Sequence, residues 1–326
     1  MSCSTLLRIG SAAIVLLFTS MTASAFAQMD LSGQWAAINQ QDNMARGPGP
    51  DLADYTGLPI NDEARAVALS YTSAMLSMTE HGCVDYTEDY LTFAPHNIMI
   101  ERVDDAVTGD ILAWKISAGG SDRAPLPIWM DGRPHPSNND AHTFSGFTTG
   151  EWEGDTLTGH MTHMRRGIVR RNGAPLSDRA TMTLHIVRHG DLLTIMTITE
   201  DPIYLEEPLV QTGSYRLNPR GIAPPTNPTC FPLTELPSLD VPGTVPHFLP
   251  GTNPDAQTFA KKYNLPLEAA YGGAQTIYPE YRKKLKDSYT PPAACTRYCC
   301  GWGGGNPQAS GLTCTVIEAP SRAGAR

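Results

Sequence analysis

Tight-turn signals recur through the middle of this chain and separate short runs that are rich in β-branched residues. Gly109, Gly154 and Gly190 each precede an aspartate between two such runs, and Asn172 and Gly173 form an Asn-Gly pair. Dipeptides of these kinds favour the tight turns that join neighbouring antiparallel strands. The pattern predicts about ten strands connected in sequence, near residues 32–38, 96–104, 110–118, 124–131, 142–152, 155–165, 167–171, 179–189, 192–200 and 209–217.

A meander of this length has to close on itself or stack into two sheets, because an open sheet edge invites aggregation. We therefore expect a mainly β fold, an up-and-down antiparallel lipocalin-like β-barrel, with a β-sandwich as the alternative. Gly33 and Trp35 at the start of the first strand resemble the Gly-x-Trp opening of lipocalin-like (calycin) barrels, in which this tryptophan plugs the closed end. An ordinary buried tryptophan on a first strand would give the same pattern.

Other segments interrupt or follow the strands. After Pro59, an acidic turn and apolar residues at helical spacing predict one inserted helix over about residues 60–79. Ten prolines between residues 219 and 254 predict an extended strap, and short helices are expected near residues 255–263 and 278–287. The predicted layout is a barrel domain over residues 28–218, a strap with short helices packed on the barrel over 219–287, and a Cys/Gly-rich tail over 288–326.

Residues 1–27 have the composition of a secretory signal peptide. Arg8 is followed by an apolar run over residues 12–18, and small residues precede Ala27. The apolar run is shorter than a membrane-spanning helix requires. We therefore expect a periplasmic or secreted protein without a stable membrane anchor.

Six cysteines remain after removal of the predicted signal peptide, namely Cys83, Cys230, Cys295, Cys299, Cys300 and Cys314. An even number of cysteines in an oxidising compartment predicts disulfide bonds. Our preferred arrangement joins Cys83 to Cys230 and leaves the other four to cross-link the tail. A four-thiolate metal site in the tail is the alternative.

The balance of charge limits the possible partners. The chain has 24 Lys and Arg against 33 Asp and Glu, a formal net charge of -9, which argues against nucleic acid as a ligand. A hydrophobic content of 41% is enough to bury a core and argues against disorder. One basic run, Arg165-Arg166 and Arg170-Arg171, could bind an anionic ligand, although a solvated hairpin with acidic partners is the favoured interpretation.

Candidate acid-base residues gather in one part of the chain, since six of the nine histidines lie between residues 135 and 189. G-x-S-x-G, H-E-x-x-H, phosphate-loop and Rossmann motifs are absent from the sequence. Alternation along the strands predicts that His163 and His185 both face the barrel interior, with His142 on a third strand. We expect these three to act as base, acid and auxiliary group, with Asp131 orienting a histidine.

The expected partner is a small hydrophobic or aromatic molecule, with or without an anionic group. The residues expected to contact it are Arg133, His135, Trp152, Arg166 and Tyr204. No cofactor is expected. The alternative is a zinc-like metal ion held by His142, His163 and His185.

Four motifs mark a further resemblance, namely MDGRPHP at residues 130–136, GEWEGDTL at 150–157, RRNG at 170–173 and DPIYLEEP at 201–208. They resemble a group of mostly uncharacterised exported bacterial proteins, and the resemblance extends over most of the chain except the tail. It implies no particular reaction.

Lipocalin-like barrels generally bind small apolar molecules, and a minority isomerise, cyclise or hydrate them. The resemblance to that fold implies a protein that binds such a molecule and transforms it by His/Asp acid-base chemistry of the isomerase, lyase or hydratase type. The alternatives are a non-catalytic carrier and a His-ligated metal-dependent hydrolase or lyase.

Overall fold

The structure is a computed structural model. It describes residues 29–38, 51–71, 87–89, 97–118, 125–170, 172–220 and 248–290. The chain divides into two compact units, residues 1–30 and 31–326, and the following description concerns the second. The predicted signal peptide, the six cysteines of the mature chain, most of the Pro-rich strap and nearly all of the tail lie outside the described residues.

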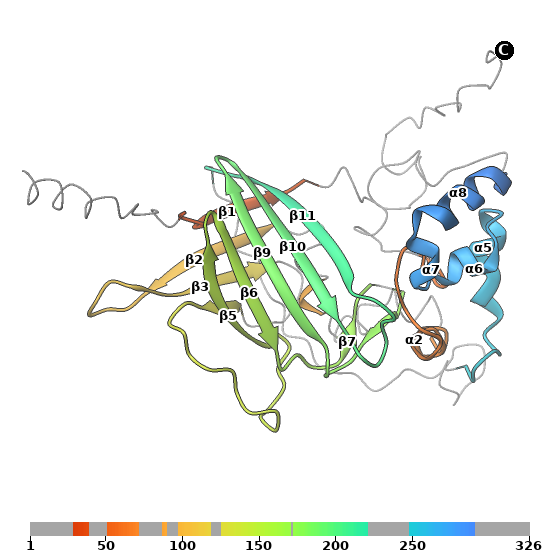
Figure 1. The fold of residues 1–326 in the computed structure, drawn as a ribbon, viewed down its shortest axis with the longest axis horizontal. Coiled ribbons are helices and arrows are strands. Elements are labelled where there is room, and N and C mark those ends of the chain that lie inside the picture. The colour runs from red at the N-terminus through yellow and green to blue at the C-terminus, as the bar shows by residue number, and fades with distance from the viewer. Residues whose placement is uncertain are drawn as a thin grey trace, which may run out of the picture. The chain divides into compact units, whose positions relative to one another are not determined.

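Nine strands form a closed β-barrel, so the prediction of a mainly β barrel is confirmed (Figure 1). The strands are β1 (Gly33–Ala37), β2 (Ile98–Asp104), β3 (Ile111–Ala118), β4 (Leu126–Trp129), β5 (Phe147–Glu153), β6 (Thr156–Thr162), β9 (Thr181–His189), β10 (Leu192–Glu200) and β11 (Leu209–Leu217). Around the ring they follow the order β1-β11-β10-β9-β6-β5-β4-β3-β2. Each strand therefore lies beside its sequence neighbour, apart from the short hairpin between β6 and β9.

That hairpin consists of β7 (Gly167–Ile168) and β8 (Pro175–Leu176), which pair with each other outside the barrel sheet. Its turn contains the predicted Asn-Gly pair, and Gly173 has a φ of 82°, which favours glycine. Asn172 is fully buried and donates from Nδ2 to the carbonyl oxygen of Asp54 at 2.6 Å. The hairpin is thus fastened to the segment that precedes the inserted helix.

Every neighbouring pair in the barrel is antiparallel except β4 and β5, which are parallel. The segment over residues 130–146, which we call the crossover segment, leaves one end of β4 and returns to the other end of the barrel before β5 begins. The predicted strand over residues 142–152 starts later than expected for this reason. A parallel connection needs such a return, whereas an antiparallel one needs only a hairpin.

Trp35 marks one end of the barrel, which we call the Trp35 end, where the β5–β6 and β9–β10 turns also lie. The indole is fully buried, and its Nε1 donates to the carbonyl oxygen of Leu31 at 3.1 Å. The Arg188 guanidinium lies over the ring, 5.2 Å from its centre. The tryptophan of the predicted first strand is therefore a core residue, as expected.

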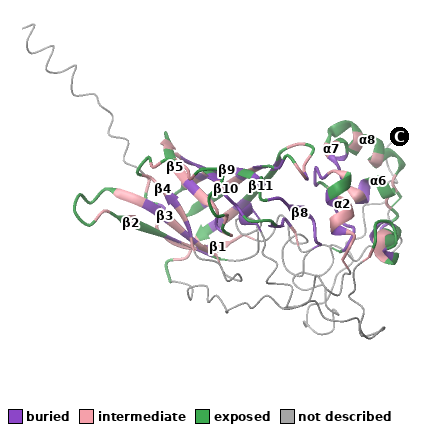
Figure 2. Ribbon diagram, turned by 90° about the horizontal axis from the view of Figure 1, so that it is seen from below, coloured by how far each residue is buried: buried purple, intermediate pink, exposed green. Residues whose placement is uncertain are grey.

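The inserted helix α2 (Asp62–Ala68) begins where the sequence predicts and ends earlier. Asn61 caps it, because its side-chain oxygen accepts from the backbone N–H of Ala64 at 2.9 Å. Tyr71 already lies in a bend beyond the helix, and residues 72–79 are outside the described part of the chain. Ala64 and Ala68 of α2 are buried, whereas α8 contains no buried residue (Figure 2).

The C-terminal helices are η2 (Pro254–Gln257), α5 (Thr258–Lys262), α6 (Leu267–Tyr271), α7 (Ala274–Ile277) and α8 (Pro279–Ser288). They include both predicted helices, and the sequence prediction missed α6 and α7. Gly272 joins α6 to α7 with a φ of 71°, and a Cβ there would lie 2.3 Å from the carbonyl oxygen of Tyr55. The helices are therefore packed backbone to backbone against the segment that leads into α2.

Candidate ligand-binding site

His135 and His163 form a hydrogen-bonded network through one hydroxyl group on the outer face of the barrel. Thr162 Oγ1 lies 2.7 Å from His135 Nδ1 and 2.7 Å from His163 Nδ1. At its two ends the network continues from His135 Nε2 to Thr149 Oγ1 at 2.8 Å and from His163 Nε2 to the Ser137 carbonyl oxygen at 2.8 Å. The crossover segment is thereby bonded to both β5 and β6.

The carbonyl oxygen of Ser137 fixes the direction of these hydrogen bonds because it can only accept. His163 therefore donates from Nε2, and in its neutral form it accepts from Thr162 at Nδ1. Thr162 in turn accepts from His135, which accepts from the Thr149 hydroxyl. Burial, together with electrostatic interaction with His163 and His160, lowers the pKa of His135, which favours the neutral ring that this arrangement requires.

His163 is not inside the barrel, contrary to the prediction. It follows the last residue of β6 and adopts a φ of 58°, so the alternation that holds along the strand does not apply to it. Its side chain is 8% exposed and contacts the crossover segment. Since both ring nitrogens already have partners, its role here is to hold that segment in place.

His142 lies beside His163, with their ring centres 5.2 Å apart. Its Nδ1 donates to the carbonyl oxygen of Met164 at 2.8 Å, which leaves the lone pair of the neutral ring on Nε2. His142 comes from the crossover segment and not from a strand, because β5 begins only at Phe147.

His185 lies on the outer face of β9, because its neighbours Leu184 and Ile186 are the ones that enter the core. Its Nδ1 lies 3.1 Å from the hydroxyl of Thr158, which donates to Glu153 at 3.1 Å. The prediction that His163 and His185 share the barrel interior is therefore wrong. Nor do His142, His163 and His185 gather as a metal site, since the described residues contain no group of three His, Cys, Asp or Glu side chains able to hold an ion.

Asp131 does not orient a histidine either. Its carboxylate forms a paired contact with the Arg133 guanidinium, with Nε to Oδ1 at 2.8 Å and Nη2 to Oδ2 at 2.6 Å. The hydrogen bonds from Arg133 hold the pKa of Asp131 below its usual range. The guanidinium also lies 3.6 Å from the centre of the Trp129 ring, so Arg133 is engaged on the outer surface.

Arg166 and Tyr204 approach each other at the end of the barrel opposite Trp35. The Arg166 guanidinium lies 6.0 Å from the centre of the Tyr204 ring. Arg166 is exposed, while Tyr204 is buried in the main core and accepts at its carbonyl oxygen from the Asn61 N–H. Of the five predicted ligand contacts, Trp152 is the one that alternation places on the inner face of a barrel strand, opposite Leu157.

The inner face of the barrel changes character along its length. Near the Trp35 end it is apolar, formed by residues such as Leu157, Ile186, Leu193, Ile195 and Tyr215. Toward the opposite end, β10 turns Thr197 and Thr199 inward, and Gln211 of β11 is the cross-strand partner of Thr197. Thr148, Met161, Met182 and Thr199 are successive cross-strand partners on β5, β6, β9 and β10.

These inward polar groups lack hydrogen-bond partners among the described residues. Thr148, Thr197 and Thr199 are 0%, 1% and 0% exposed and Gln211 is 6% exposed. The inward side-chain atoms of the barrel strands without a partner are Thr148 Oγ1, Thr197 Oγ1, Thr199 Oγ1, both Gln211 amide atoms, and Nε1 of Trp114 and Trp152. A buried polar atom without a partner is unfavourable, and a group of them lining one interior is the pattern of a site that a ligand or bound water completes.

The sequence reasoning missed this group although a signal was present. In β10 the inward positions run Leu193, Ile195, Thr197 and Thr199, so the apolar alternation becomes polar halfway along the strand. Because threonine is common in strands, its presence in β10 does not by itself indicate a polar site. Only the closure of the barrel shows that these hydroxyls meet Gln211 and Thr148 across an interior.

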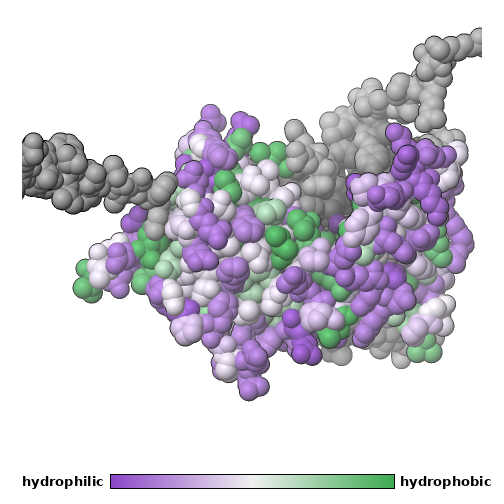
Figure 3. Space-filling model, in the orientation of Figure 1, coloured by the Kyte–Doolittle hydropathy of each residue, from purple (hydrophilic) through white to green (hydrophobic). Residues whose placement is uncertain are grey.

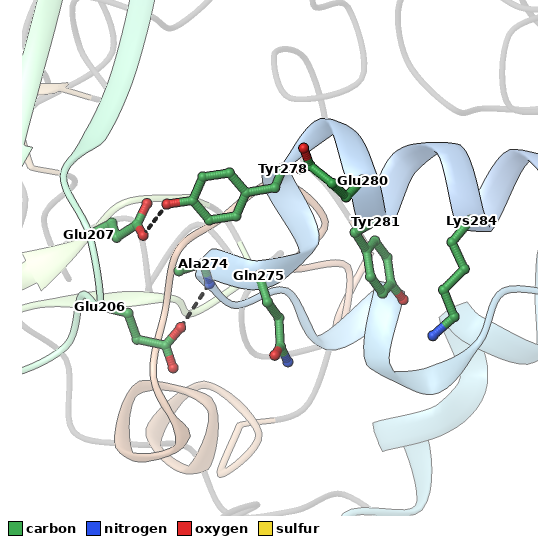
Figure 4. A pocket seen from close by; sticks show the side chains of 8 residues that line it. All are labelled: Glu206, Glu207, Ala274, Gln275, Tyr278, Glu280, Tyr281 and Lys284. Carbon is green, nitrogen blue, oxygen red and sulfur yellow. Dashed lines mark hydrogen bonds between the residues drawn. The ribbon is translucent and has the colours of Figure 1, made fainter.

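A hollow lies on the surface between the loop after β10 and helices α7 and α8 (Figure 4). It has a volume of about 680 Å³, and its polar groups include Glu206, Glu207 and Lys284. Glu206 accepts from the Ala274 N–H at 2.7 Å, and Glu207 accepts from the Tyr278 hydroxyl, a contact that raises the pKa of this phenol. These carboxylates fasten α7 and α8 to the barrel and already have partners.

The surface in Figure 3 is mainly hydrophilic, with hydrophobic side chains scattered over it. Exposed apolar residues such as Val107, Val210 and Leu249 come from separate parts of the fold. Isolated apolar side chains of this kind are normal on a protein surface. The barrel interior is therefore the stronger candidate site among the described residues.

Comparison with protein-family models, curated proteins and solved structures gave no match for this chain. The resemblance of its four motifs to a group of exported bacterial proteins stays a prediction. In the described part of the chain, no helix has the length and apolar character needed to cross a membrane.

Proposed function

We propose that this protein binds a small, largely apolar molecule inside its barrel. The observation that carries the proposal is the set of buried inward polar atoms without partners, on Thr148, Thr197, Thr199 and Gln211, next to an apolar inner wall. The interior of a barrel of about eight strands is either filled by side chains or holds one small ligand, and this barrel has nine strands. The ligand would supply the missing hydrogen bonds.

The placement of the histidines favours a carrier over an acid-base enzyme. Both ring nitrogens of His135 and His163 are engaged in fastening the crossover segment, and His185 lies on the outer face of β9. An acid or base must reach the reacting group directly or through one water. The predicted isomerase, lyase and hydratase reactions gain no support from this geometry.

Export is part of the proposal and rests on the sequence of residues 1–27 alone. A carrier in the periplasm or outside the cell would keep a poorly soluble molecule in water. The proposed disulfides among the six remaining cysteines would stabilise such a protein.

The test is a fluorescence titration with Nile red, a neutral apolar dye whose emission rises in apolar surroundings. We expect saturable binding at one site per chain. In one variant, Thr197→Phe fills the interior, and in the matched variant, Thr194→Phe places the same side chain on the exposed outer face of the same strand. Circular dichroism establishes that both variants are folded.

Thr197→Phe should weaken Nile red binding by about tenfold or more, since the ring occupies the proposed site. Thr194→Phe should bind like the original protein. Equal binding by both folded variants, or a dye signal that never saturates, would refute binding inside the barrel.

A further inference from the structure

We infer that Gln211 recognises a neutral amide-type group of the ligand, one that offers a hydrogen-bond donor and an acceptor side by side. This inference rests on the proposed function, because it concerns the same interior. It goes beyond that function by naming the chemical class of the ligand and the residue that selects it. The ligand class is an apolar molecule with a lactam at one end, because the ring of a lactam holds its amide in the cis form.

The inference starts from the side-chain amide of Gln211, whose oxygen and nitrogen both lack a hydrogen-bond partner within the described part of the chain. The Gln211 carboxamide has one acceptor oxygen and an NH2 donor in a single plane. Both Oε1 and Nε2 are buried and have no partner among the described residues, and the side chain is 6% exposed. A cis amide offers the complementary pair, so that it donates to Oε1 and accepts from Nε2.

The neighbours of Gln211 support the same chemistry. Its cross-strand partner is Thr197, and Thr199 is the next inward residue along β10. Both hydroxyls are buried without a partner, and each can donate or accept. They can therefore form the remaining hydrogen bonds of an amide that is bound by Gln211.

Charge excludes an ionised ligand group at this position. Among the described residues, the inward neighbours of Gln211 are Leu209 and Gly213 on its own strand and the two threonines on β10, and all are neutral. An ion buried without a counter-charge is strongly disfavoured. The basic residues Arg165 and Arg166, which suggested an anionic ligand, are exposed instead.

The apolar residues near Gln211 indicate that the rest of the ligand is apolar. Ile195 is the inward residue that precedes Thr197 along β10 toward the Trp35 end, and Leu184 is the cross-strand partner of Thr197 on β9. Both are buried in the core cluster. An amide held at Gln211 would place an alkyl or aromatic body against this wall, in the half of the barrel that closes at Trp35.

The experiment compares two molecules that differ by one group. δ-Decalactone has an acceptor carbonyl and a ring oxygen, and the corresponding δ-lactam has an N–H in place of that oxygen. Each displaces Nile red from the protein, and decanoate serves as an anion with a similar apolar tail. We expect the lactam to compete about tenfold more strongly than the lactone, because the lactone leaves Oε1 of Gln211 unpaired, and decanoate to compete least.

Replacement of the selecting residue gives the second arm. In Gln211→Leu the preference for the lactam over the lactone should disappear, while Nile red still binds. Thr212→Leu makes a similar change at the neighbouring outward position and should keep the preference. Equal competition by lactam and lactone in the original protein, or a preference that survives in Gln211→Leu, would overturn the inference and leave the barrel site standing. Failure of Nile red to bind the original protein at all would instead remove the proposed function and the inference with it.

Discussion

Replacement of Thr162 by Val tests the histidine network on the outer face of the barrel. The Thr162 hydroxyl is the one atom that contacts both His135 and His163, at 2.7 Å each. Valine keeps the shape and the preference for a strand, and it removes this hydroxyl. The substitution therefore breaks two hydrogen bonds and leaves Nδ1 of each ring without a partner.

The expected loss follows from those two contacts. A hydrogen bond between uncharged groups contributes about 0.5–1.5 kcal/mol to the free energy of unfolding, so two contribute about 1–3 kcal/mol. Thr162 and His135 are only partly buried, and water can solvate the freed ring nitrogens. The loss should therefore fall in the lower half of that range.

Urea unfolding followed by circular dichroism measures this loss. The matched control is Thr183→Val, which removes an outward hydroxyl on β9 for which the structure shows no hydrogen bond. Amide hydrogen exchange adds a local measurement, because the Thr143 N–H donates to the backbone carbonyl oxygen of His163 and the Arg165 N–H donates to that of Thr143. Both amides should exchange faster in Thr162→Val and be unchanged in Thr183→Val. If Thr162→Val destabilises the protein no more than the control, the network does not hold the crossover segment.

Two further predictions concern acidity and backbone packing. Burial lowers the pKa of His135, so below the unfolded value of about 6.5 the unfolded chain binds a proton that the folded one does not. Stability should therefore fall as the pH drops through 6 in urea unfolding and fall less steeply in His135→Gln, and parallel profiles for the two proteins would contradict this. Gly272→Ala places a Cβ 2.3 Å from the Tyr55 carbonyl oxygen at a φ of 71° and should lower the free energy of unfolding by more than about 2 kcal/mol. Gly251→Ala, with a φ of 78° and no atom within 4 Å of the Cβ, should lose less, and equal thermal unfolding of the two variants would count against the contact.

The hairpins could be predicted because each depends on residues that are adjacent in sequence. Gly109, Gly154 and Gly190 all have positive φ values, of 75°, 62° and 58°, as their place in tight turns requires. The parallel pairing of β4 with β5 could not be predicted in this way. It depends on the path of the crossover segment, whose His135 contacts Thr149 on β5 and Thr162 on β6, residues that are distant from it in sequence.

The candidate site was harder to predict because alternation fails where a strand ends. His163 was placed by counting along β6, but one residue with a φ of 58° turns its side chain out of that series. His185 lies on a regular strand, where the apolar residues Met182, Leu184 and Ile186 mark the inward face, and the prediction failed because it assigned the alternate residues to that face. The absence of partners for Gln211 and Thr197 is a property of the folded interior, which no sequence motif records.

The parallel pair gives the barrel a seam. Ile128–Thr148 and Trp129–Thr149 are the two residue pairs that join β4 to β5, whereas the strands beside this seam are joined over most of their length. The crossover segment is bonded beside this seam through His135, with one ring nitrogen on β5 and the other on β6. The shortest junction of the ring is therefore supported from outside the sheet, by a segment that contributes no strand to the barrel.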